Sequence, residues 1–207
     1  MLKKISDIGI VPVIKINDVE KAVPLAKALI DGGLPIAEIT FRTDAAEESI
    51  RRVSEAFPEM LVGAGTVLTI EQAERAKNAG AKFIVSPGFN PKVVSWCLEN
   101  DIIPTPGCTS PTEIEQALEL GLKVVKFFPA NVYGGLNAMK NLSAPFVGLK
   151  FLPTGGVNTG NIKEYIDAPF IHAVGGSWVC PKADIAAGNW EKITQLCLEA
   201  RAAAMGE

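Results

Sequence analysis

The sequence predicts an α/β fold, a single (β/α)8 or TIM barrel that spans residues 1–207, from three observations. Short apolar runs recur about every 20 to 25 residues, and each is followed by a longer amphipathic stretch. This alternation is typical of parallel strands joined by helices, and it occurs eight times. No GxGxxG turn follows the first run, so a flavodoxin-like open sheet is kept only as the alternative fold.

Eight apolar runs are expected to form the strands of the barrel. In chain order they are 10–16, 36–41, 61–65, 83–86, 102–105, 124–128, 150–153 and 171–175. Amphipathic segments predict helices between them, over 18–30, 45–56, 70–79, 91–99 and 111–120. Since 207 residues accommodate eight such units only when the loops are short, no room remains for a second domain.

Local signals mark the ends of two of these helices. Thr69 is placed as an N-cap, with Gln72 three residues later to complete a capping box, and Gly80 follows the end of the helix. The pair Ser110-Pro111 and the residue Gly121 bracket the helix over 111–120 in the same way.

Composition excludes several classes of function. The formal net charge is −3 without a long basic block, which argues against DNA, RNA or an anionic membrane as the main partner. The N-terminus lacks a signal-peptide core, and no segment approaches the ~20 apolar residues that span a bilayer. We therefore expect a cytoplasmic protein with no nucleic-acid or membrane partner.

The cysteine and histidine content argues against a transition-metal site. The four cysteines lie far apart without a CxxC pair, which fits isolated reduced thiols. The single histidine, His172, cannot form the multi-histidine set of a catalytic zinc or iron site. We expect no metal, although a carboxylate-bound magnesium stays open.

Lys126 interrupts the apolar run VVKFF on the sixth predicted strand. Both faces of a parallel barrel strand are largely dry, and burial disfavours the ammonium form of a lysine. The neutral amine is the form that attacks a ketone carbonyl to make a Schiff base, which then acts as an electron sink. The alternatives are a lysine paired with a strand carboxylate for stability alone and a lysine that extends to the rim of the barrel.

Two charged residues on the second predicted strand fit the same chemistry. Glu38 lies within an apolar run, where a carboxylate needs a partner or a role, and it is suited to moving protons around an imine. A buried ion pair between Glu38 and Lys126 is the simpler interpretation, and it does not exclude catalysis. Arg42, at the strand end, suits a bidentate contact with a substrate carboxylate or, alternatively, braces the next helix.

Glycine-rich turns follow the seventh and eighth strands, at the place where barrels of this type often bind phosphate. Glycine lets the backbone approach an anion closely, and a serine hydroxyl adds a donor. We expect the phosphate site to comprise Gly155, Gly156, Gly175, Gly176 and Ser177. Thr154 lies at the edge of this pocket, and its alternative role, like that of Ser177, is ordinary turn chemistry. Thr66 is a further polar candidate, and its alternative role is that of a threonine preceding a helix.

Two other functions use the same phosphate turns. A phosphosugar isomerase or epimerase barrel would work with acid–base residues and no covalent lysine. A non-catalytic phosphosugar-binding protein would need neither Lys126 nor Glu38, and the presence of both argues against it.

The segments EITFRT, GAGTV, SPG, KFFPA, PTGG and GGSW occur in this order on successive strands. Over nearly the whole chain this pattern closely resembles the 2-keto-3-deoxy-6-phosphogluconate (KDPG) and 4-hydroxy-2-oxoglutarate (KHG) aldolases. The resemblance implies a class I aldolase that needs no metal or other cofactor. It would cleave its phosphorylated 2-keto acid to pyruvate and glyceraldehyde 3-phosphate.

The resemblance also implies roles for individual residues. Lys126 would form the imine and Glu38 would transfer protons. The substrate contacts would come from Arg42 and Thr66 on the pyruvate carboxylate, Pro87 and Phe128 around the pyruvate unit, Thr154 near the substrate hydroxyls, and Gly155, Gly156, Gly175 and Ser177 on the phosphate. A homotrimer is implied as well.

Two positions bear on which 2-keto acid the protein prefers, and neither decides it. Family members often continue KFFPAE, whereas this chain has Asn131, which removes a charge beside the predicted site. Lys15 stands where related chains vary, and it is kept as a possible anion contact. The gluconate-derived, galactonate-derived and 4-hydroxy-2-oxoglutarate substrates are not distinguished by these residues.

Overall fold

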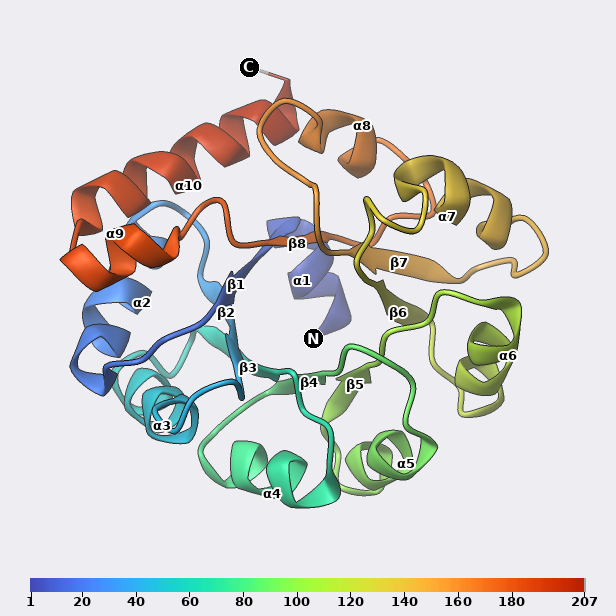
Figure 1. Cartoon of the computed structure of the whole chain (residues 1–207), viewed down its shortest axis with the longest axis horizontal. Coiled ribbons are helices and arrows are strands. Elements are labelled where there is room, and N and C mark those ends of the chain that lie inside the picture. Colours follow the sequence, from blue (N-terminus) through green and yellow to red (C-terminus); the bar gives the residue numbers. More distant parts are fainter. Residues whose placement is uncertain (207) are drawn as a thin grey trace.

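The computed structural model describes residues 1–206, and within them eight parallel strands form a ring surrounded by helices (Figure 1). The strands are β1 (Ile10–Ile14), β2 (Ile36–Thr40), β3 (Leu61–Gly65), β4 (Phe83–Val85), β5 (Ile103–Thr105), β6 (Val124–Phe127), β7 (Lys150–Pro153) and β8 (Val174–Gly176). The predicted (β/α)8 barrel is therefore confirmed.

Two sheets join to close this ring. Six strands pair in the order β5-β4-β3-β2-β1-β8, and β6 pairs with β7. Isolated bridges connect the two groups: Gly107 pairs with Lys126 beside β5, while Phe151 pairs with Ile171 and Thr154 pairs with Gly175 beside β8. All of these pairings are parallel, so the carboxyl ends of the eight strands meet on one face of the closed ring.

Alternation along the strands separates two apolar cores. The inner core fills the ring and includes Val11, Ile36, Leu61, Phe83 and Val124. The outer core lies between the strands and the helices, where residues of the opposite parity, such as Ile39 and Phe127, pack. Parity therefore predicts that Glu38 and Lys126, each two residues after an inner-core residue, point into the ring.

Helices surround the ring, except for α1, which lies across its middle in the view of Figure 1. They are α1 (Leu2–Ile8), α2 (Ala22–Asp31), α3 (Ala46–Ala56), α4 (Ile70–Asn78), α5 (Pro91–Glu99), α6 (Pro111–Glu119), α7 (Gly135–Ser143), α8 (Ile162–Ile166), α9 (Lys182–Ala187) and α10 (Trp190–Met205), with a 3-10 turn at Val19–Lys21. In residues 1–206 no helix is both long and apolar enough to cross a membrane.

The predicted N-caps are present at α4 and α6. The Thr69 side chain accepts a hydrogen bond from the backbone N–H of Gln72, as an N-cap does. The predicted capping box is not formed, because the Gln72 side chain accepts from the N–H of Leu68 rather than from that of Thr69. Ser110 and Glu113 form a complete capping box at the start of α6. Each cap satisfies N–H groups that the helix leaves without partners, typically worth about 1 kcal/mol.

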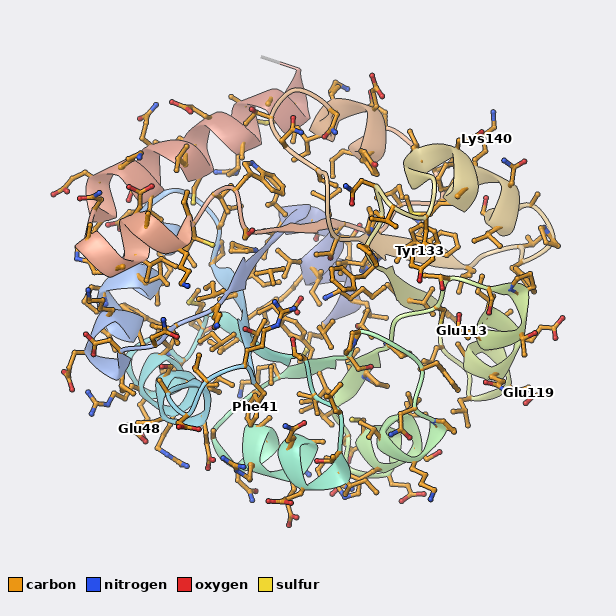
Figure 2. The ribbon with its side chains drawn as sticks, in the orientation of Figure 1. Phe41, Glu48, Glu113, Glu119, Tyr133 and Lys140 are labelled. Carbon is orange, nitrogen blue, oxygen red and sulfur yellow. The ribbon has the colours of Figure 1, made fainter. Side chains whose placement is uncertain are left out.

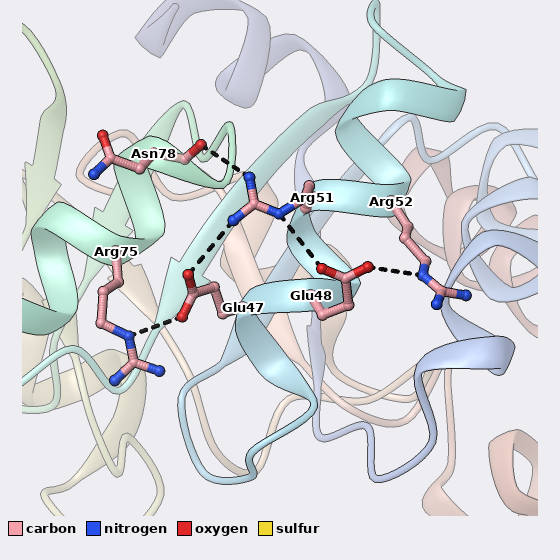
Figure 3. A network of polar contacts seen from close by, with 6 residues as sticks. All are labelled: Glu47, Glu48, Arg51, Arg52, Arg75 and Asn78. Atoms are coloured by element: carbon pink, nitrogen blue, oxygen red, sulfur yellow. Dashed lines mark hydrogen bonds and ion pairs between the residues drawn. The ribbon is translucent and has the colours of Figure 1, made fainter.

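Surface ion pairs connect neighbouring helices outside the barrel. Glu47 on α3 contacts Arg51 on the same helix and Arg75 on α4, and Glu48 contacts Arg51 and Arg52 (Figure 3). Charged side chains elsewhere, such as Glu119 and Lys140, likewise point away from the ring (Figure 2). These pairs are partly exposed and therefore contribute little stability each.

Three local expectations needed revision. The first strand ends at Ile14 rather than at residue 16, since the ladder with β2 ends at the pair Ile14–Ile39. The last strand begins at Val174 rather than at 171, because Ile171 makes only an isolated bridge. The first helix, α1, has no counterpart among the predicted elements; its Ile5 packs in the inner core and closes the amino end of the barrel.

Within residues 1–206, no group of three or more His, Cys, Asp or Glu residues is arranged to hold a metal ion. All four cysteines are free and buried, and burial raises the pKa of the Cys97, Cys108 and Cys197 thiols to about 12. His172 donates from Nε2 to the carbonyl of Leu2 over 3.0 Å, which ties α1 to the chain before β8. Burial lowers the pKa of His172.

Candidate active site

A cavity of about 500 Å³ opens at the carboxyl ends of the strands. Its walls come from residues at or just after β1, β2, β6, β7 and β8, and four of the lining side chains are cationic: Lys15, Arg42, Lys126 and Lys182. No Asp or Glu is among the described residues that line it. A concave site with these charges favours an anionic ligand.

Lys126 lines this cavity, and Glu38, which is not among the lining residues, contacts it inside the ring. The Lys126 Nζ donates to Glu38 Oε1 over 3.2 Å, and their side chains are only 6% and 1% exposed. The other Glu38 oxygen, Oε2, is buried and has no hydrogen-bond partner among the described residues. The expected proximity of Lys126 and Glu38 is thus present.

The backbone and a neighbouring ring hold Lys126 in place. Its backbone N–H donates to the carbonyl of Pro106, and its carbonyl accepts from the N–H of Cys108, both in the segment that follows β5. Its Nζ lies 5.4 Å from the centroid of the Phe128 ring, at a distance suited to a cation–π contact. Because β6 lies in a closed ring, the amine is fixed relative to the cavity to a precision that a loop would not give.

Arg42 and Thr66 form a polar pair at the ends of β2 and β3. The Arg42 Nε donates to Thr66 Oγ1 over 3.0 Å, which leaves the terminal nitrogens of Arg42 for another partner. Thr66 has φ of 56°, an uncommon backbone conformation for a residue with a side chain. Arg42 lines the cavity, so its guanidinium can contact a carboxylate there.

The two glycine turns lie side by side at the other wall of the cavity. Gly155 and Gly156 have φ of 99° and 83°, values that strongly favour glycine. Both line the cavity, together with Gly176 and Ser177. The turns follow neighbouring strands and line the same space, so their backbone N–H groups and the Ser177 hydroxyl are candidate donors to an anion there.

Asn131 packs directly behind the first of these turns. A Cβ built on Gly156 would lie 2.5 Å from the Asn131 Cβ and 3.0 Å from its Cγ. The Asn131 N–H also donates to the Gly155 carbonyl over 3.2 Å. Asn131, the residue that departs from the family pattern, therefore contacts the glycine turn with an uncharged side chain.

The remaining predicted residues fall at different depths. Thr154 lines the cavity and is buried, with its hydroxyl unpaired among the described residues. Gly175 lies behind Thr154, to which it is bridged. Pro87 is absent from the lining and lies beside Gly107 at the ends of β4 and β5.

The lining residues that were not assigned from the sequence include Trp178, Cys180 and Lys182. Trp178 packs its ring over Gly176, and it was visible in the GGSW segment. Lys182 begins α9 and carries no sequence signal, because a lysine there is typical of any exposed helix. Cys180 stays a thiol, since burial raises its pKa, and it therefore is a poor nucleophile.

Comparisons with known proteins identify relatives over almost the full chain. A family model described as KDPG and KHG aldolase matches residues 2–196. A 2-dehydro-3-deoxy-phosphogluconate aldolase from Treponema pallidum is 49% identical, covering 91% of this chain and 90% of its own. A KHG/KDPG aldolase from Escherichia coli is 39% identical over 92% and 90% of the two chains.

A solved structure matches the fold closely. It is a KDPG aldolase from Legionella pneumophila with pyruvate captured at low pH as a covalent carbinolamine intermediate. The TM-score is 0.93 at 38% identity, over 97% of this chain and 98% of the other.

Proposed function

This chain belongs to the KDPG and KHG aldolase family, and we propose from its site that it cleaves 2-keto-3-deoxy-6-phosphogluconate to pyruvate and glyceraldehyde 3-phosphate. It is a lyase of the class I, Schiff-base type. Cleavage of 4-hydroxy-2-oxoglutarate to pyruvate and glyoxylate is the second reaction that we propose, since one relative is a KHG/KDPG aldolase.

The observation that carries the proposal is the buried pair of Lys126 and Glu38, of which Lys126 lines a cavity with cationic walls. A carboxylate 3.2 Å from the ammonium nitrogen can accept its proton, which leaves the neutral amine that imine chemistry requires. The substrate carries a carboxylate and a phosphate, and the charges of the cavity complement both.

Imine formation follows from this geometry in balanced steps. Glu38 takes a proton from Lys126, and the amine attacks the C2 ketone of the substrate to give a carbinolamine. Glu38 then returns the proton to the carbinolamine hydroxyl, which leaves as water. The product is an iminium ion that joins Lys126 to C2.

Carbon–carbon cleavage uses the iminium ion as the electron sink. Glu38 removes the proton of the C4 hydroxyl, the C3–C4 bond breaks, and its electron pair moves through C2 onto nitrogen to form an enamine. The aldehyde leaves. Glu38 then donates the proton to C3, and water hydrolyses the resulting imine to release pyruvate and free Lys126.

The other residues bind and orient the substrate in this proposal. Arg42 holds the carboxylate, and Thr66 orients the Arg42 side chain through their 3.0 Å hydrogen bond. Phe128 and, more remotely, Pro87 surround the pyruvate unit. Thr154 contacts a substrate hydroxyl, while the phosphate lies against the turns formed by Gly155, Gly156, Gly175, Gly176 and Ser177.

Several finer features are proposed from the sequence and from the family resemblance. Residues 1–207 form one catalytic domain, which the family match over residues 2–196 supports. The enzyme is a cytoplasmic homotrimer that serves the Entner–Doudoroff branch of carbohydrate metabolism. Light scattering on the purified protein measures the subunit number directly.

Reduction in the presence of pyruvate tests the function. Borohydride should convert the imine into a stable amine, so mass spectrometry should find an irreversible adduct on Lys126 and on no other lysine. Pyruvate release from KDPG should be lost in Lys126→Ala and should persist in the presence of a chelator. An unmodified protein that still turns over substrate would instead favour an isomerase-type barrel.

A further inference from the structure

Two of the three residues of β3 that face into the ring are glycines, which have no side chain. Leu61 packs in the inner core, and the next residues of the same parity are Gly63 and Gly65. Gly63 pairs with Glu38 across the ladder, and Gly65 pairs with Thr40. The interior of a protein leaves few voids, so neighbouring side chains fill the space above both glycines.

A different neighbour occupies each of these two spaces. A Cβ built on Gly63 would overlap the ring of Phe83, a core residue of β4. A Cβ built on Gly65 would overlap Glu38 Oε1 and would lie 2.7 Å from Cγ and 2.8 Å from Cδ. The Glu38 carboxyl group therefore lies where the side chain of residue 65 would be.

The oxygen that occupies this space is the one that faces the lysine. Glu38 Oε1 is the atom that accepts from Lys126 Nζ over 3.2 Å. The Glu38 side chain is 1% exposed and its surroundings are packed, so the carboxyl group has little room to move aside. The φ angle of Gly65 is not in the left-handed region, so the backbone would accept an alanine. Space, and not backbone conformation, thus distinguishes glycine from alanine at this position.

We propose that Gly65 is a positioning residue for the reaction, because its missing side chain provides the space that holds the Glu38 carboxylate against Lys126. It acts through Glu38 and touches no substrate, and the inference rests on the proposed role of Glu38 in proton transfer. Gly65→Ala displaces Oε1 from Lys126. Misplacement of a reacting group by about 1 Å can slow a reaction about 100-fold, and we expect a loss of kcat on this scale.

Substrate binding should be almost unaffected by the same change. Arg42 and Ser177 line the cavity, whereas the three atoms nearest to a Cβ built on Gly65 all belong to Glu38, so KM for KDPG should stay within about threefold of its original value. The matched control is Gly88→Ala, at which a Cβ meets nothing within 4 Å. It should leave both constants unchanged.

A second measurement separates this steric coupling from general damage. Gly65→Ala should lower the urea midpoint when Glu38 is present and should not lower it in a Glu38→Ala background, where the overlapping atoms are gone. If Gly65→Ala alone does not fold, Gly65→Ala/Glu38→Ala must still fold as well as Glu38→Ala. Equal losses in the two backgrounds would overturn the proposal, as would a kcat within twofold of the original.

The proposed function and this inference fail in different ways. If pyruvate and borohydride leave the unaltered enzyme unmodified, the Schiff-base role of Lys126 is wrong. The coupling of stability between positions 65 and 38 is measured without substrate, so it tests the placement of the carboxyl group whatever the chemistry is.

Discussion

Replacement of Lys126 by methionine should leave Glu38 as an unpaired buried carboxylate. Methionine keeps most of the length of the lysine stem, so packing changes little. At 3.2 Å and an effective dielectric constant of about 20, Coulomb's law gives the pair about 5 kcal/mol. Since Glu38 Oε2 already lacks a partner among the described residues, little else compensates the remaining charge.

The expected loss of unfolding free energy is therefore about 3 to 5 kcal/mol, the usual consequence of breaking a buried pair by removing one partner. With a urea slope of roughly 2 to 3 kcal/mol per molar, the midpoint should fall by roughly 1 to 2.5 M. Urea denaturation followed by circular dichroism measures this shift.

The double variant Lys126→Met/Glu38→Gln is the control for this reasoning. It removes both charges while keeping the two side-chain shapes, so most of the lost stability should return. A single variant within about 1 kcal/mol of the original protein would show that the pair is not a dry ion pair. An equal loss in both variants would assign the effect to packing.

Two further expectations concern the phosphate turn and acid stability. Ser177→Ala should raise KM for KDPG about tenfold, or about 1.4 kcal/mol, with kcat nearly unchanged in steady-state assays. An equal rise in KM for 4-hydroxy-2-oxoglutarate, which has no phosphate, would contradict the phosphate assignment. Burial lowers the pKa of His172 in the native state. As the pH falls below the ordinary histidine pKa of about 6.5, the unfolded chain therefore binds a proton before the native protein does, and the free energy of unfolding decreases. His172→Gln should therefore lose less stability between pH 7 and pH 5 in urea titrations, and an unchanged pH slope would show that other groups govern acid unfolding in this range.

Local patterns in the sequence predicted most of the fold. The apolar runs placed all eight strands, and the caps at Thr69 and Ser110 are present at the predicted helix starts. Both faces of these barrel strands are buried, so the inward direction of Glu38 and Lys126 follows only from the two cores of the structure. The helix α1 was missed because seven residues carry too little periodicity to separate a helix from a loop.

The sequence by itself determined which chemistry is present: a lysine and a glutamate on dry strands, and glycine turns at two strand ends. Only the tertiary structure decided which side chains share one space, because ring closure brings together residues that are far apart in the chain. The overlap of Glu38 with the space above Gly65, the entry of Lys182 into the cavity wall and the absence of Pro87 from it all depend on that closure. These three features depend on contacts between separate parts of the chain, so the sequence of one segment does not predict them.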